Sequence, residues 1–357
     1  MNICYIITST IKCGPVNVLF NTVKDYQKYS DFRPFIITLK EDDPNRSRRE
    51  EFRNLGIKVV QFDSQSELDE IKSFIVENNI DVIHSHGLGP DILNRKLTKA
   101  FPDKIHMTTL HNFPLEDYVI NRGKVKGTLM SALQLWAIKD LYKVSCSEAI
   151  QSKFKDKLSI KTDVIENGVI YPDMTDIHGT LNNDRKVFLY LGDIHRRKNT
   201  EFLVDFFAKH PEYELWIVGD GDGEYFENVK QKAESINNVV MWGRTKSPSK
   251  YYKKADFLIS DSYSEGLPMT VLESLSYGLP VILSDIPSHK EVLKKKNLGR
   301  IFKLDDEEDL EDKLREVSSA KFSNVDIFNQ SKQFFSAKVM MNNYVELYRK
   351  LMEGSND

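Results

Sequence analysis

The sequence has little cysteine and no long apolar run. Three cysteines occur among 357 residues, without a Cys-x-x-Cys pair, which argues against a disulfide framework and against a zinc site. No stretch approaches the roughly 20 consecutive apolar residues that a membrane-spanning helix needs. The first residues, Met-Asn-Ile-Cys-Tyr-Ile-Ile-Thr, lack the basic region and cleavage site of a secretory leader. We therefore expect a protein of the reducing cytoplasm.

An excess of charge of either sign is also missing. The 50 Lys and Arg residues nearly balance the 53 Asp and Glu residues, and the formal net charge is -3. This balance excludes the global basic field of a typical nucleic-acid-binding protein, so we expect no nucleic-acid partner. The 40% hydrophobic residues and the length favour a globular protein of two domains.

Short apolar, β-branched runs alternate with amphipathic stretches along the whole chain. This alternation predicts an α/β fold with two parallel, doubly wound sheets. The predicted strands are Ile3–Ile7, Pro34–Leu39, Lys58–Phe62, Val82–Ser85, Ile105–Leu110, Lys143–Cys146, Asp163–Ile165, Val187–Leu191, Glu214–Val218, Val239–Trp242, Phe257–Ser260 and Val281–Ser284. The predicted helices are Val16–Tyr29, Leu68–Asn78, Lys126–Leu141, Thr200–Lys209, Glu224–Ser235, Met269–Tyr277, Asp309–Val317 and Ala337–Met352.

The polar segment Tyr171–Arg185 divides the two sets of strands and contains Pro172 and Gly179. We therefore expect two Rossmann-like domains, residues 1–168 and residues 169–336. Ligands of parallel α/β sheets bind beyond the carboxyl ends of the strands. The candidate functional residues are those that directly follow each strand.

The clearest motif follows the eleventh predicted strand, runs from Ser262 to Leu275 and is closed by Gly278-Leu279-Pro280. Gly266 permits a tight backbone and Pro268 suits the opening of a helix, so the motif forms a loop that leads into a helix N-terminus. Such an N-terminus attracts an anion through its N–H groups and its dipole. Glu265 adds a carboxylate on the loop and Glu273 adds one on the helix, and ionised carboxylates accept hydroxyl donors well. The motif indicates a phosphate site flanked by hydroxyl-rich groups.

A second motif, Tyr190–Asn199, lies at the end of the strand Val187–Leu191 and contains Arg196-Arg197-Lys198. Cations at a strand end can stabilise a diphosphate as its bond to another group breaks.

The pattern Glu265-x7-Glu273, with the Gly-Leu-Pro between, resembles the signature of the retaining glycosyltransferases of family 4, of the bacterial surface-polysaccharide type. The resemblance covers nearly the whole chain. It implies the GT-B fold, in which two Rossmann-like domains face each other across an interdomain cleft. It also implies an N-terminal acceptor-binding domain, a C-terminal domain that binds a nucleotide sugar, and a final helix within 337–357 that packs back on the first domain.

The resemblance assigns roles to the residues of both motifs. It implies that Glu265 lies against the donor sugar, that Glu273 binds the ribose hydroxyls and that Lys198 binds the diphosphate. Three loop amides would approach the sugar and the diphosphate: those of Leu267, Met269 and Thr270.

The chain departs from the family at one position of the second motif. The family usually has an arginine directly after the glycine that corresponds to Gly192, and this sequence has Asp193. Either Arg196 or Arg197 reaches back to replace that arginine, or Lys198 acts alone. We favour Arg196.

Further candidates follow other strands. His111 resembles the family histidine that contacts the donor sugar, and Gly14 stands where the family has a glycine-rich turn near the diphosphate or the acceptor. Arg244 falls where the family's chain meets the base, with an exposed arginine as the alternative. His84 and His86 resemble a strand-end His-x-His pair that shapes the floor of the cleft. No carboxylate or thiol is spaced to complete a metal site with them.

The reaction that the resemblance implies is a transfer of a sugar with retention of its anomeric configuration. The donor would be a nucleotide sugar, with UDP as the expected carrier, and the acceptor a glycan or a lipid-linked molecule. No metal and no cofactor are expected, because lysine, arginine and a helix N-terminus supply the positive field.

Four other interpretations are weighed. Gly219–Glu224 fails as a dinucleotide fingerprint at its last position, where Glu224 stands. Asp220-Gly221-Asp222 matches the metal motif of a single-domain glycosyltransferase fold, which disagrees with two sheets. A sugar-nucleotide epimerase shares the architecture but lacks the two glutamates in this form. A binding or chaperone-like subunit without turnover stays open because of Asp193.

The segment Arg122–Lys143 mixes basic residues with large apolar ones. We favour a helix that packs on the core with solvated lysines. Peripheral contact with an anionic membrane is the alternative.

Overall fold

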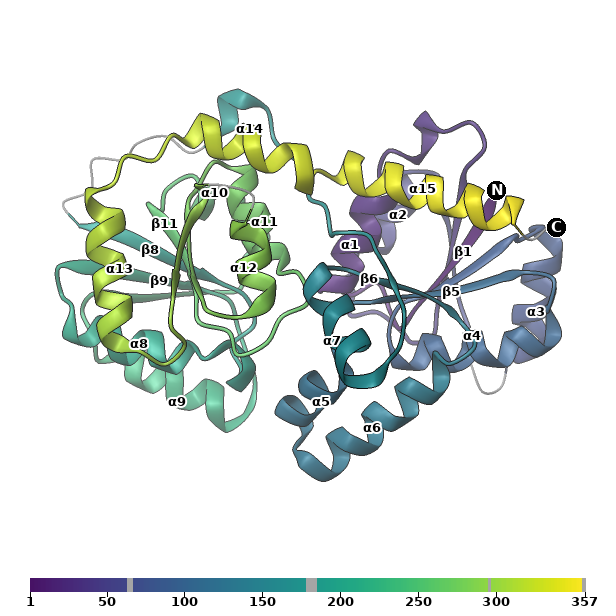
Figure 1. The fold of residues 1–357 in the computed structure, drawn as a ribbon, viewed down its shortest axis with the longest axis horizontal. Coiled ribbons are helices and arrows are strands. Elements are labelled where there is room, and N and C mark those ends of the chain that lie inside the picture. The colour runs from purple at the N-terminus through teal and green to yellow at the C-terminus, as the bar shows by residue number, and fades with distance from the viewer. Residues whose placement is uncertain (63–66, 178–184, 295–296, 355–357) are drawn as a thin grey trace. The chain divides into compact units, whose positions relative to one another are not determined.

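The computed structural model describes residues 1–62, 67–177, 185–294 and 297–354 (Figure 1). The chain divides into two compact units, Met1–Gly168 with Ala337–Asp357, and Val169–Ser336. These bounds coincide with the domains expected from the sequence. Of the expected join at 171–185, residues 178–184 lie outside the described residues, as do residues 355–357 of the C-terminal segment.

The first unit is built on a seven-stranded parallel sheet with the order β3-β2-β1-β4-β5-β6-β7. The strands are β1 (Asn2–Ile7), β2 (Arg33–Thr38), β3 (Lys58–Gln61), β4 (Val82–Ser85), β5 (Ile105–Leu110), β6 (Tyr142–Ser145) and β7 (Asp163–Val164). In the register of β4 and β5, Ser85 pairs with Thr108, so both strands end at the same edge of the sheet. Both strands are buried almost continuously, because helices cover both faces of a parallel sheet.

Eight helices accompany this sheet among the described residues, and the last comes from the C-terminal segment. They are α1 (Gly14–Val23), α2 (Arg49–Asn54), α3 (Leu68–Glu77), α4 (Leu88–Ala100), α5 (Pro114–Arg122), α6 (Lys124–Ala137), α7 (Glu148–Leu158) and α15 (Ala337–Glu353). Helix α15 packs against α1 and buries Met340, Tyr344 and Tyr348. The last helix of the chain is therefore part of the first unit.

The second unit has a six-stranded parallel sheet with the order β10-β9-β8-β11-β12-β13. Its strands are β8 (Lys186–Leu191), β9 (Tyr213–Val218), β10 (Val239–Gly243), β11 (Phe257–Ser260), β12 (Val281–Ser284) and β13 (Gly299–Phe302). Its helices are α8 (Thr200–Lys209), α9 (Gly223–Glu234), α10 (Ser249–Tyr252), α11 (Met269–Ser276), α12 (Pro287–Leu293), α13 (Glu307–Ser319) and α14 (Asn324–Phe335).

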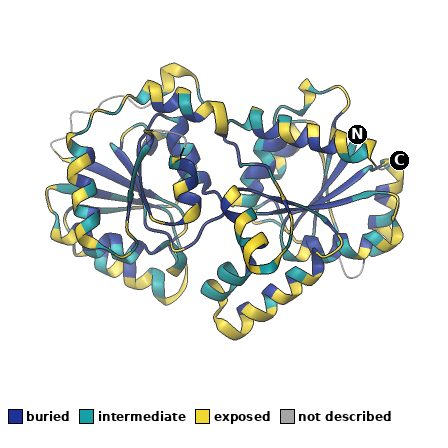
Figure 2. Cartoon of the chain, viewed as in Figure 1, coloured by how far each residue is buried: buried dark blue, intermediate teal, exposed yellow. Residues whose placement is uncertain are grey.

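Each sheet forms the centre of its own hydrophobic core. Figure 2 shows the strands buried within each unit and the outer helix faces exposed. The first core contains Cys4, Ile37 and Ile83, and the second contains Phe188 and Phe207. The predicted α/β class with two doubly wound parallel sheets is thus confirmed, whereas the predicted cleft between the domains stays a prediction.

No helix among the described residues is long and apolar enough to cross a membrane.

Candidate active site

The candidate site of the second unit is built on the loop that joins β11 to α11. The helix begins at Met269, directly after Pro268, whose backbone is extended. Leu267 and Met269 are buried, which anchors the end of the loop to the core, while Thr270 is partly exposed. The first N–H groups of a helix have no partner within the helix. The loop leads into a helix N-terminus, as the motif predicted, and the anion site there stays a prediction.

Glu265 lies on this loop between two cations. Its Oε2 is 2.9 Å from Nη1 of Arg197, and its Oε1 is 2.6 Å from Nζ of Lys198. Only 7% of the glutamate is exposed. Burial alone would raise the pKa of its carboxyl, but the charges of Arg197 and Lys198 hold that pKa well below its usual range. The cluster is ionised at neutral pH and carries one net positive charge.

The local backbone explains how the two cations reach the glutamate. A 3-10 turn, Arg196–Lys198, follows β8, and the N–H of Tyr263 donates to the carbonyl of Arg197 over 2.9 Å. A guanidinium N–H of Arg197 also donates to the carbonyl of Ser264. The turn after β8 and the loop after β11 are therefore joined by backbone as well as by charge.

The arginine beside Glu265 is Arg197, although the sequence favoured Arg196. The guanidinium of Arg196 lies 5.7 Å from the ring centroid of Tyr225 instead. The difference follows from the 3-10 turn, in which successive side chains point about 120° apart. The direct role of Arg196 in donor binding stays a prediction.

Asp193, which stands where the family has an arginine, pairs with another predicted residue. Its carboxylate is 3.1 Å from Nη2 of Arg244, whose Nε is 3.9 Å from Asp220. Both partners of the first pair are well exposed, so the pair contributes little to stability. Arg244 follows β10, and its expected contact with the base stays a prediction.

Glu273, the second glutamate of the motif, lies within α11. Its Oε2 accepts a hydrogen bond of 2.9 Å from the hydroxyl of Tyr252, which is buried. Burial and the charge of Glu273 both raise the pKa of Tyr252 well above its usual value, so the tyrosine stays a donor. The bond orients one carboxylate oxygen of Glu273.

A buried carboxyl supports the turn that carries Lys198. Asn199 adopts a left-handed backbone with φ 50°, and its amide donates to Asp261 over 2.6 Å and to Asp305 over 2.8 Å. Burial, together with the charge of Asp305, raises the pKa of Asp261 to about 8, although the bond from Asn199 opposes the shift. Asp261 is therefore largely protonated at neutral pH.

His289, on α12, is a residue of this region that sequence reasoning missed. Its Nδ1 lies 3.0 Å from the carbonyl of Ser284, and the hydroxyl of Ser284 donates to the carbonyl of Ser262 over 2.9 Å. Because a carbonyl only accepts, Nδ1 carries the hydrogen. Burial lowers the pKa of His289 to about 4, against the opposing charge of Glu265. The signal that could have found it is its place shortly after a strand end.

Three histidines gather at the strand ends of the first unit. His84 and His86 stack with ring centroids 4.5 Å apart, and His86 and His111 stack at 5.1 Å. A hydrogen bond of 2.8 Å joins Nδ1 of His86 to Nε2 of His111. Burial lowers the pKa of His111 to about 4, so this ring is neutral at physiological pH. The predicted contact of His111 with the donor sugar stays a prediction.

His84 serves the fold of the first unit. It is fully buried, its Nδ1 is 2.8 Å from the hydroxyl of Tyr348, and its Nε2 is 2.8 Å from the hydroxyl of Thr109. Thr109 in turn bonds Tyr344 over 2.8 Å. Both ring nitrogens are thus used to join the strand ends to α15. Among the described residues, no group of three or more His, Cys, Asp or Glu is placed to hold a metal ion.

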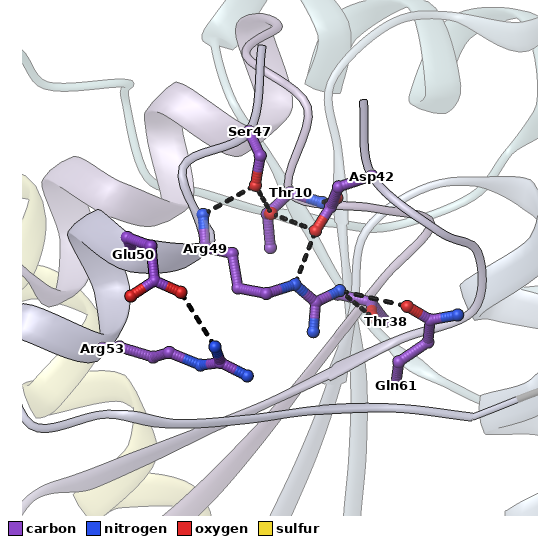
Figure 3. Close-up of polar contacts among 8 residues, drawn as sticks. All are labelled: Thr10, Thr38, Asp42, Ser47, Arg49, Glu50, Arg53 and Gln61. Atoms are coloured by element: carbon purple, nitrogen blue, oxygen red, sulfur yellow. Dashed lines mark hydrogen bonds and ion pairs between the residues drawn. The ribbon is translucent and has the colours of Figure 1, made fainter. Parts of the chain in front are cut away.

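The loop before Gly14 is held by a polar network at the ends of β1, β2 and β3 (Figure 3). Asp42 accepts from the backbone N–H of Thr10 over 2.6 Å and from Nε of Arg49 over 2.7 Å. Arg49 also donates to Thr38 and to Gln61. A Cβ added to Gly14 would meet nothing within 4 Å, so the local packing does not itself require a glycine there.

Two doubly wound parallel sheets in one chain are the architecture of the GT-B class. Residues 175–334 match the model of the family described as glycosyl transferases group 1. This match supports the resemblance of the motifs to the group 1 glycosyltransferases.

Individual relatives extend the likeness over most of the chain. An O-antigen biosynthesis glycosyltransferase, WclY of Escherichia coli, is 28% identical over 308 residues, 82% of each chain. An alpha-monoglucosyldiacylglycerol synthase of Streptococcus pneumoniae is 27% identical, over 83% of this chain and 69% of the synthase. The structure of HepE from Anabaena in complex with UDP-glucose shares the fold, with a TM-score of 0.81, 16% identity, and coverage of 98% and 100%.

Proposed function

We propose that this glycosyltransferase moves a sugar from a nucleotide diphosphate, with UDP as the carrier, to a glycan or lipid-linked acceptor, and retains the anomeric configuration. The observation that carries the proposal is the cluster of Arg197, Lys198 and Glu265 beside the N-terminus of α11. Two cations and a helix N-terminus suit a diphosphate, and the adjacent carboxylates suit sugar and ribose hydroxyls.

In the proposed mechanism, the bond between the anomeric carbon and the β-phosphate oxygen breaks while the acceptor hydroxyl oxygen bonds to the same carbon from the same face. The acceptor proton passes to the departing phosphate oxygen, so no protein nucleophile is needed. Lys198 and Arg197 stabilise the charge that grows on the diphosphate. The positive field of these side chains and of the helix N-terminus supports a reaction without a metal ion.

Each glutamate has a separate part in this proposal. Glu265 contacts the donor sugar, and Glu273 accepts the ribose hydroxyls through a carboxylate that Tyr252 already orients on one side. Arg197 supplies the positive charge that the family takes from the position of Asp193. His111 and Gly14 stay candidates contributed by the first unit.

The wider role that we propose is the synthesis of a surface polysaccharide or a glycolipid, at the cytoplasmic face of the membrane. Two relatives support this role, since one is an O-antigen biosynthesis glycosyltransferase and the other an alpha-monoglucosyldiacylglycerol synthase.

A panel of UDP- and GDP-sugars tests the proposal by thermal shift and by isothermal titration. We expect one nucleotide series to bind, and Glu273→Ala to weaken that binding about tenfold or more by removing two ribose hydrogen bonds. Glu234→Ala, at the exposed end of α9, serves as the control. Unchanged binding by Glu273→Ala would contradict the assigned site.

The product identifies the reaction class. Nuclear magnetic resonance of the transferred sugar should show the anomeric configuration of the donor. Isomerisation of UDP-N-acetylglucosamine without an acceptor would instead support an epimerase, and binding without any donor hydrolysis or transfer would support a subunit without turnover.

A further inference from the structure

Helix α6 in the first unit turns its large apolar side chains outward. Val125, Leu129, Leu133 and Trp136 are exposed at 89, 71, 41 and 49%. Their spacing of four, four and three residues puts them on one face of the helix. Figure 2 shows much of this helix as exposed surface. Contiguous apolar side chains on a surface mark an interaction site, whereas scattered ones do not.

The inward face of α6 is small and polar, which reverses the usual arrangement of an amphipathic helix. Its buried positions are Gly127, Ser131, Gln134 and Ala137. A Cβ added to Gly127 would lie 2.5 Å from the carbonyl of Tyr118, so only glycine permits the close approach of α5. Gln134 donates to the buried carboxylate of Asp91 over 3.0 Å. Polar contacts therefore hold the helix, and its apolar face has no place in the core. The prediction that this helix packs its large apolar residues on the core is therefore wrong.

Basic residues surround this apolar face. Four are exposed: Arg122, Lys124, Lys126 and Lys139. No Asp or Glu occurs from Tyr118 to Lys139. The next acid, Asp140, is 2.9 Å from Nη1 of Arg95. The surface therefore combines an apolar stripe with a local positive charge that the balanced overall composition hides.

Trp136 is held in place on this surface. The guanidinium of Arg95 lies over its ring, 4.5 Å from the centroid, and donates to its backbone carbonyl over 2.7 Å. A fixed, half-exposed indole beside a cation suits the boundary between lipid head groups and acyl chains.

We propose that the outward face of α6 docks on a membrane surface that contains anionic lipids. The helix has 14 residues and a length of about 21 Å, so it would lie along the surface with its apolar stripe in the head-group region. Lysine is depleted at protein–protein interfaces but is attracted by anionic lipids, which favours lipid over a protein partner. A second copy of the chain would bring like charges together. The contact goes beyond the sugar transfer and does not require it.

Flotation with vesicles of phosphatidylcholine, with and without phosphatidylglycerol, tests this inference on the whole chain and without a donor. The wild type should bind the vesicles with phosphatidylglycerol, and salt should weaken the binding. Two double variants should each bind these vesicles at least about tenfold more weakly than the wild type: Leu129→Ser/Trp136→Ser and Lys124→Gln/Lys126→Gln. The matched control, Val76→Ser/Val325→Ser, changes exposed apolar residues of other helices and should bind like the wild type.

Two further measurements keep the test decisive. The unfolding midpoint of each variant should match that of the wild type, because the changed side chains are exposed. Brominated lipids should quench the tryptophan fluorescence of the wild type but not that of Trp136→Phe. Absence of binding to any vesicle, equal binding by Leu129→Ser/Trp136→Ser, or self-association through this face without vesicle binding would each overturn the proposal.

Discussion

Asp261 is a carboxyl group that the fold keeps protonated. It is fully buried, accepts a hydrogen bond from Asn199 and lies near the charge of Asp305. The neighbouring Lys198 depends on the backbone of Asn199, so the ionisation of Asp261 bears on the position of the proposed phosphate-binding lysine.

The raised pKa of Asp261 predicts a loss of stability as the pH rises. An unfolded aspartate has a pKa of about 4, and the folded one has a pKa of about 8, so the favourable contribution is complete at low pH and is lost between these values. Asp261→Asn should remove this part of the pH dependence. The check is urea unfolding of both proteins across that pH range. Parallel curves for the two proteins would contradict the assignment.

At the residue scale, the sequence predicted the types of residue at the site better than their contacts. Glu265 and Lys198 meet as a pair in the proposed site. The sequence favoured Arg196, whereas Arg197 lies beside Glu265, because successive side chains of the 3-10 turn point about 120° apart. His289 was missed because it follows no recognised motif and bonds the nearby Ser284, while its link to Ser262 runs through the Ser284 hydroxyl.

Helix α15 is joined to the strand ends of the first unit by buried hydroxyls. Tyr348 bonds His84 over 2.8 Å and Tyr5 over 3.0 Å, and all three residues are fully buried. The helix therefore fixes the strand ends that carry His86 and His111.

Tyr348→Phe should lower the free energy of unfolding by about 2 kcal/mol, because it leaves two buried polar groups without a partner. Tyr142→Phe, which removes a hydroxyl bonded to Asp163 near the surface, should cost less than about 0.5 kcal/mol. Urea unfolding measures both. Equal losses of unfolding free energy in the two variants would mean that the buried hydrogen bonds of Tyr348 stabilise the protein no more than the surface hydrogen bond of Tyr142.

At the element scale, the strands were easier to predict than the helices. The predicted strands are mostly buried runs rich in apolar residues, whereas the edge strand β13 begins with Gly299 and Arg300 and was not predicted. Helix α4 begins with Leu-Gly-Pro, a sequence that is typical of a turn, and the helix was not predicted for this reason. The orientation of α6 could not be predicted, because an apolar stripe has the same period whether it faces inward or outward.

The two units differ in how the chain forms them. The second is one continuous segment, Val169–Ser336, with its own sheet and core, whereas the first needs the C-terminal helix to complete it. The sequence predicted this division from the repeat of strand–helix alternation and from a polar join.

The segment Val169–Ser336 alone should unfold cooperatively and bind UDP with nearly the affinity of the whole chain, because Arg197, Lys198 and Glu273, proposed for the diphosphate and the ribose, belong to it. Thermal unfolding and isothermal titration measure the two properties, and Glu273→Ala in the same segment is the control for specific binding. A folded segment that fails to bind UDP, when the whole chain binds it, would show that the nucleotide site is assigned too narrowly.

The central claim is that Lys198, paired with Glu265, stabilises a diphosphate as it leaves a sugar. The most direct measurement is the rate at which UDP or GDP is released from the panel of nucleotide sugars by the wild type, by Lys198→Ala and by Lys209→Ala. Lys209 is an exposed lysine of α8 in a surface ion pair with Glu307 and serves as the matched control. We predict release by the wild type and by Lys209→Ala, and a rate about 100-fold or more lower for Lys198→Ala. An unchanged rate for Lys198→Ala would contradict the account.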